Sequence, residues 1–305
     1  MSYVLEPEEP LNAGIKRIVR EQIDHALEQL IAAPEGQEEA VHDSRKRFKK
    51  VRAALRLVRD EIGEEIYQSE NVCYRDAGRR LSDLRNSYVM IKTLDDITKR
   101  YLNDLHSTPS VKLREKLMAE YEALKCRMLD HDEAMADVTA TIRKARQRVE
   151  TWPIKDNDFS ALSAGLKRVY KRGRQGLANA YTNPKAENFH EWRKRVKYLW
   201  YHIRLLENLW PNFLDELADQ IHDLADYLGD DHDLAELRCV LLDRPDLFNR
   251  ENDMEILIGV MNQRQTELKR VARRLGERIY VEKPKTFVKR IGKYWQLWQA
   301  DTVLV

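Results

Sequence analysis

The sequence has few residues that break helices, with only 11 glycines and 9 prolines among 305 residues. Its three cysteines, Cys73, Cys126 and Cys239, have no CxxC or Cys/His spacing, which argues against a disulfide framework and a structural zinc site. No run of 18 apolar residues occurs, and the first ten residues, MSYVLEPEEP, are acidic. These absences argue against a membrane span and a classical secretion signal, so we expect a cytoplasmic protein.

Charge is abundant but unevenly distributed. Charged residues make up 34% of the chain and the formal net charge is +2. Residues 42–59 nevertheless carry eight Lys and Arg against one acid, and residues 190–207 carry five against two. Positive charge is therefore concentrated in two segments of an otherwise acidic chain, which indicates an anionic partner.

These two segments contain a repeated motif. HDSRKRFK begins at His42 and HEWRKRVK begins 148 positions later, at His190. A second pair, LNAGIKRIV at Leu11 and LSAGLKRVY at Leu162, is repeated in the same order, 151 positions apart. The chain is therefore predicted to be an internal duplication, and the boundary near TWPIKDND divides it into residues 1–155 and 156–305.

Hydrophobic periodicity favours helices throughout and strands nowhere, so the predicted fold class is all-α. Helix breaks are expected at AAPEG, STPS, TWPIKDND, YTNPK, Trp210-Pro211 and EKPK. Short connections favour antiparallel neighbours, so each half is predicted to be an up-and-down four-helix bundle. The segment KTFVKRIGKYWQLW is expected to add an amphipathic helix at the C-terminus.

Each repeated motif forms a cationic strip when it is drawn as a helix at 100° per residue. In the first copy the strip contains His42, Arg45, Lys46, Lys49, Ala53 and Arg56, and in the second His190, Arg193, Lys194, Lys197, Tyr201 and Arg204. The opposite sides are apolar, with Phe48, Val51, Leu55, Val58 and Ile62 in the first copy and Trp192, Val196, Leu199, Ile203 and Leu206 in the second.

A solvated helix face is the simplest alternative explanation of such a strip. A solvated face usually alternates Glu with Lys, whereas here cations stack at i,i+4 spacing, and each such pair costs roughly 0.2–0.5 kcal/mol. Residues 42 to 56 would span about 21 Å of helix, which is longer than a triphosphate, so two facing strips fit a chain of phosphates. The repeated cations Lys16, Arg20, Lys167 and Lys171 either rim this cavity or face water.

The doubled motif resembles the CHAD domain, the conserved histidine α-helical domain. His42/Arg45/Lys46/Lys49 and His190/Arg193/Lys194/Lys197 match its pattern, and LGDDHDL at Leu228 resembles its Leu-Gly-x-x-x-Asp segment. The corresponding LSDLRNSYV at Leu81 departs from that pattern at Ser82 and Asn86. The resemblance covers roughly residues 10–300.

The resemblance implies two pseudo-symmetric four-helix bundles around a basic central cavity that binds inorganic polyphosphate, with association to polyphosphate granules. It implies a non-catalytic, stand-alone module without a cofactor, because the ExExK signature of the triphosphate tunnel domain often fused to CHAD is absent. The expected polyphosphate-binding residues are His42, Arg45, Lys46, Lys49, Arg56, His190, Arg193, Lys194, Lys197, Arg204, Lys16, Arg20, Lys167 and Lys171.

Two other functions are considered. A metal-dependent phosphoester hydrolase could use the carboxylates of Asp230, Asp231 and Asp233 with His232, and a second His-Asp pair begins at His131. A nucleic-acid binder could use the same phosphate contacts and stack bases on Trp192, Trp200, Tyr198 or Tyr201, of which only Tyr201 projects centrally onto the strip.

Overall fold

The computed structural model describes residues 3–33, 36–101, 108–129, 132–245, 248 and 251–303. It is 87% helical, and no strand occurs in the described residues. The prediction of an all-α fold is confirmed.

The helices are α1 (Leu11–Ala32), α2 (Gln37–Leu57), α3 (Arg59–Ile62), α4 (Glu64–Arg80), α5 (Asp83–Arg100), α6 (Thr108–Leu129), α7 (Asp132–Arg148), α8 (Ser160–Thr182), α9 (Ala186–Leu205), α10 (Pro211–Asp243), α11 (Glu251–Ile279) and α12 (Pro284–Val303). Two short 3₁₀ turns, η1 (Val149–Thr151) and η2 (Glu207–Leu209), lie between them. The predicted breaks fall at helix boundaries, and α12 is the expected C-terminal helix. The boundaries between α2, α3, α4 and α5, between α6 and α7 and between α10 and α11 were not predicted.

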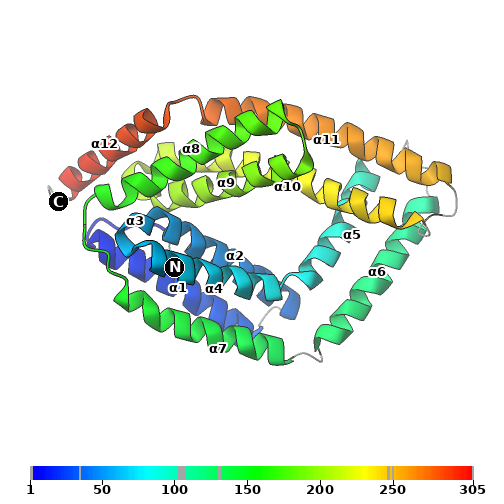
Figure 1. Ribbon diagram of the computed structural model, residues 1–305, viewed down its shortest axis with the longest axis horizontal. Helices are drawn as coiled ribbons and strands as arrows, with labels where there is room; N and C mark the ends of the chain where they lie inside the picture. The colour runs from blue at the N-terminus through cyan, green and yellow to red at the C-terminus, as the bar shows by residue number, and fades with distance from the viewer. Residues whose placement is uncertain are drawn as a thin grey trace.

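Contacts divide most of the helices into two groups of four (Figure 1). In the first, α1 packs on α2, α2 on α4, α4 on α7, and α7 on α1. In the second, α8, α9, α10 and α11 close a similar ring, and α12 packs on α8. Helices α5 and α6 pack on each other, and α5 reaches across to α10.

The hydrophobic core forms two clusters, and each draws residues from both sides of residue 155. The larger cluster contains the apolar sides of α2 and α9, namely Phe48, Val51, Leu55, Val58, Ile62, Trp192, Val196, Leu199, Ile203 and Leu206, all of which are buried. The smaller cluster joins α5 and α6 to α10 and α11. The predicted orientation of both basic helices is therefore confirmed, because their apolar sides face the core.

Gly165 of the repeated LSAGLKR element permits a close helix contact. A Cβ at this position would overlap the carbonyl oxygen of Leu57 at the end of α2. Because no other residue lacks a Cβ, Gly165 lets α8 approach the backbone of α2. This contact joins the two groups of helices.

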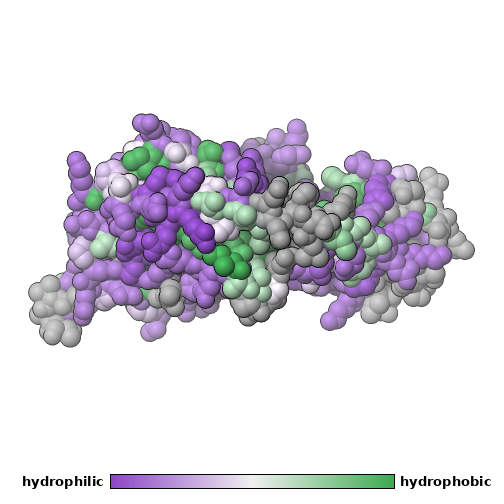
Figure 2. Space-filling model, turned by 90° about the horizontal axis from the view of Figure 1, so that it is seen from below, coloured by the Kyte–Doolittle hydropathy of each residue, from purple (hydrophilic) through white to green (hydrophobic). Residues whose placement is uncertain are grey.

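The face of the molecule shown in Figure 2 carries mostly hydrophilic residues, and hydrophobic residues form small patches between them. Among the described helices, none combines the length and the apolar character needed to cross a membrane.

Replacing Gly165 with Ala should destabilise the protein by about 1–3 kcal/mol, because the new methyl group must displace backbone atoms of α2. Gly259 of α11 is a matched control, since nothing lies within 4 Å of a Cβ there. Gly259→Ala should stabilise the protein by about 0.5–1 kcal/mol through helix propensity. Urea unfolding measures both changes, and a neutral Gly165→Ala substitution would contradict the close contact.

Candidate functional site

The two basic helices, α2 and α9, lie in contact with each other. Lys46 and Lys49 of α2 are exposed, and Arg193 and Lys194 of α9 are partly exposed. Both helices contribute charge at the contact, because Arg193 of α9 and Arg47 of α2 act electrostatically on the same residue, Tyr201. The structure therefore brings cations of both motif copies together.

The arginine of each motif packs on the helix that follows. Arg45 donates to the carbonyl oxygen of Gly78 (2.6 Å) and to the hydroxyl of Ser82, which lies where α4 ends and α5 begins. The guanidinium of Arg193 instead lies against Gly229, where a Cβ would sit 3.2 Å from its Nη2 atom. Gly229 of the second half thus packs closely against Arg193. At the corresponding position of the first half, the hydroxyl of Ser82 accepts a hydrogen bond from Arg45.

The histidine of the second motif is uncharged at neutral pH. His190 packs against His232 of α10, with the ring centroids 4.2 Å apart. Burial, followed by the charge of His232, lowers the pKa of His190 to about 4. Burial also lowers the pKa of His232 to about 4, with help from Arg193. His190 is therefore a neutral hydrogen-bonding group within a cationic surface.

Burial also lowers the pKa of two lysines on the motif helices, Lys197 and Lys50. Lys197 lies over the ring of Trp200 (5.5 Å) and 3.7 Å from Asp226, and its pKa is lowered mainly by burial. Lys50 lies over the ring of Tyr3 (4.8 Å), and burial together with Arg47 lowers its pKa to about 8. An anion bound nearby would favour the protonated form of both lysines.

The predicted strip is interrupted where α2 and α9 touch. Ala53 and Tyr201, expected on the strip, are both buried, and His202 Nε2 donates to the carbonyl oxygen of Ala53 (2.9 Å). The prediction of a continuous strip over residues 42 to 56 was therefore wrong at its centre, because helix packing covers that part. Tyr201 also cannot offer its face to a stacked base.

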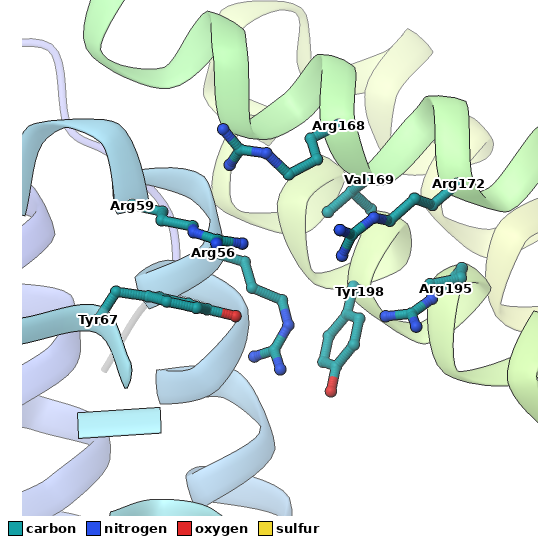
Figure 3. Close-up of a pocket in the computed structure, with 8 residues that line it drawn as sticks. All are labelled: Arg56, Arg59, Tyr67, Arg168, Val169, Arg172, Arg195 and Tyr198. Atoms are coloured by element: carbon teal, nitrogen blue, oxygen red, sulfur yellow. The ribbon is translucent and has the colours of Figure 1, made fainter. Parts of the chain in front are cut away.

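Beyond this contact lies a pocket of which the sequence had pointed only to Arg56, as a phosphate ligand, and Tyr198, as a stacking ring. It is lined by Arg56, Arg59, Tyr67, Arg168, Val169, Arg172, Arg195 and Tyr198. Figure 3 shows arginines from α2 and α3 on one side and from α8 and α9 on the other pointing toward one another. We call this group the arginine pocket. Its residues come from five helices, so no local sequence pattern contains them.

The remaining predicted site residues lie elsewhere. Arg204 is paired with Glu207 (3.0 Å) and Asp215 (2.8 Å). Lys16 donates to the carbonyl oxygen of Glu150 (2.8 Å), and Arg20 pairs with the carboxylate of that residue. Lys167 and Lys171 are exposed on α8. Of these residues, Arg204 acts electrostatically on Lys50 of α2.

The acidic segment of α10 does not converge on one point. Asp231 is buried, accepts a hydrogen bond from Gln265 (3.1 Å) and lies 3.4 Å from Lys269, whereas His232 faces His190. Across the described ranges, no three His, Cys, Asp or Glu side chains are grouped so that they could hold a metal ion. His131 lies outside the residues that the structure describes.

These observations define an all-α protein whose two motif helices bring a cationic surface together. The model of the CHAD domain matches residues 17–242, and the chain belongs to this family. CHAD domains are in general associated with polyphosphate binding. Helices α11 and α12 lie beyond the matched residues. No curated protein sequence matches the chain.

Stability should fall as the pH decreases from 6.5 to about 4. The unfolded chain binds protons at its histidines near pH 6.5, whereas folded His190 and His232 remain neutral down to about pH 4. The unfolded state therefore binds more protons in this range, and the stability present above pH 6.5 is lost below it. Unfolding free energies of the wild type and His190→Gln/His232→Gln, measured by urea at several pH values, should differ in slope here. Equal slopes would contradict the two neutral imidazoles.

Proposed function

We propose that this protein binds inorganic polyphosphate without hydrolysing it and associates with polyphosphate granules in the cytoplasm. The observation that carries the proposal is the meeting of two copies of one cationic motif, from α2 and α9, within a CHAD domain. Like charges brought together in a folded protein repel, and a bound polyanion offsets that repulsion.

The chemistry of the surface favours a phosphate chain over a nucleic acid. Lys46 and Lys49 are exposed point charges, whereas Arg193 offers a planar guanidinium. Both can bind phosphate oxygens without any contact to a base or sugar. Because Tyr201 is buried, the ring expected at the centre of the strip gives no stacking platform.

Charge reversal on either helix should weaken binding of long polyphosphate. Lys49→Glu on α2 and Lys194→Glu on α9 should each reduce the affinity by more than the roughly 1 kcal/mol of an isolated exposed charge contact. Each reversal adds repulsion as well as removing attraction. Calorimetric titration at several salt concentrations measures the affinity, which should fall steeply with salt.

Lys144→Glu on α7 provides the control, because Lys144 is exposed and carries the same charge outside the two motif helices. It should bind long polyphosphate nearly as well as the wild type, and helical circular dichroism should be unchanged in all variants. Equal affinity for long polyphosphate, ATP and single-stranded DNA would contradict selection of a phosphate chain. In cells that contain granules, Lys49→Glu/Lys194→Glu should become diffuse.

Incubation with long polyphosphate and Mg²⁺ or Mn²⁺ should release no phosphate above a sample without protein. The physical reason is that Asp231 contacts Gln265 and Lys269. In the described part of the chain, no three His, Cys, Asp or Glu side chains are grouped so that they could hold a metal ion. Free phosphate is measured by a colorimetric assay over several hours. Sustained release that disappears in Asp230→Ala/Asp233→Ala would establish a hydrolase instead.

A further inference from the structure

The arginine pocket carries more positive charge than its carboxylates neutralise. Arg59 pairs with Glu64 (2.6 Å), Arg168 with Asp60 (2.6 Å) and Arg195 with Glu191 (3.3 Å). Among the residues that the structure describes, Arg56 and Arg172 have no carboxylate partner. Five guanidiniums therefore share three carboxylates, and each of these carboxylates is at least 48% exposed.

Of these two guanidiniums, only that of Arg56 is held by hydrogen bonds to described residues. Arg56 donates to the amide oxygen of Asn71 (2.9 Å), and its guanidinium lies over the ring of Tyr198 (4.0 Å) (Figure 3). Arg172 forms no hydrogen bond or ion pair with any described residue. Nη1 of Arg168 is buried and also has no hydrogen-bond partner in the described part of the chain. The guanidinium of Arg172 and the Nη1 atom of Arg168 therefore lack hydrogen-bond acceptors among the described residues, and both residues line the arginine pocket.

The other copy of the motif shows that the fold does not require this excess charge. At the offset of 148 residues, Arg204 and Glu207 correspond to Arg56 and Arg59. Asp215 likewise corresponds to Tyr67. Arg204 is neutralised by both acids, at 3.0 Å and 2.8 Å.

The helices α1 and α8 show the same difference. At their offset of 151 residues, Glu21 occupies the position that corresponds to Arg172, and Arg17 the position that corresponds to Arg168. Arg17 is paired with Glu21 (3.2 Å) and Glu9 (2.5 Å). The carboxylates of Glu21 and Glu207, which pair with Arg17 and Arg204, are thus replaced by Arg172 and Arg59 in the arginine pocket.

We propose that the arginine pocket is a second anion site, which binds one terminal phosphate group. A terminal phosphate carries about −1.5 to −2 charges at pH 7, whereas an internal phosphate of a chain has a single ionisable oxygen. Guanidiniums suit such a group, because each can donate two hydrogen bonds to its oxygens. The terminal group comes either from the end of a polyphosphate chain, in which case the proposal rests on the proposed function, or from a small free phosphate.

Pyrophosphate, which consists of terminal groups only, is the probe. Arg172→Glu installs the residue type found at the corresponding Glu21, and Arg172 is exposed, so the variant should fold. It should weaken calorimetric binding of pyrophosphate by about tenfold or more. Arg174→Glu is the matched control, since Arg174 is an exposed arginine of the same helix outside the pocket lining, and should bind as the wild type does.

Long polyphosphate with free ends and with amine-capped ends distinguishes the two sources. If the chain end occupies the pocket, Arg172→Glu should weaken binding of pyrophosphate and of the free-ended polymer, and should leave binding of the amine-capped polymer unchanged. If a small phosphate occupies it, the variant should weaken pyrophosphate binding alone. Unchanged pyrophosphate binding in Arg172→Glu, or none in the wild type, would overturn the proposal. Failure of the proposed function is separate, because it appears as absent binding of either polymer to the wild type.

Discussion

The contact of α2 with α8 and α9 is the constraint on which the rest of the site depends. It combines a glycine without a Cβ at position 165, a small residue at Ala53 and a hydrogen bond from His202 to the backbone. This packing brings two sets of cations, distant in sequence, onto one surface. It also covers the centre of the strip, so the cations at the N-terminal ends of α2 and α9 are separated from those of the arginine pocket.

Three cations of the two motif helices are partly buried. The pKa values of Lys50, Lys197 and Arg56 are all lowered, and burial is the leading cause in each case. A lowered pKa means that the charged form of each side chain is less stable in the folded protein than it is in water. An anion that binds beside these groups reverses that effect, and part of its binding free energy therefore comes from relieving unfavourable charge.

Sequence reasoning could predict what depends on local pattern. The helical periodicity gave the orientation of α2 and α9, since the stripe from Phe48 to Ile62 is fully buried, and the doubled motif pointed to the family. It could not predict that Tyr201 lies at a helix crossing, because its position on the strip is set by a partner helix. Nor could it assemble the arginine pocket, whose members Arg59, Arg172 and Arg195 meet only through tertiary packing.

A neutral histidine in a cationic site has a consequence for binding. At pH 7 His190 adds no charge, so it does not contribute to the electrostatic attraction for a polyanion. A phosphate placed next to the imidazole would stabilise its protonated form and raise its pKa. Proton uptake and anion binding are then linked, and each strengthens the other as the pH falls. In the proposed binding site, His190 would thus couple the affinity to pH, which a lysine at the same position, already charged, would not do.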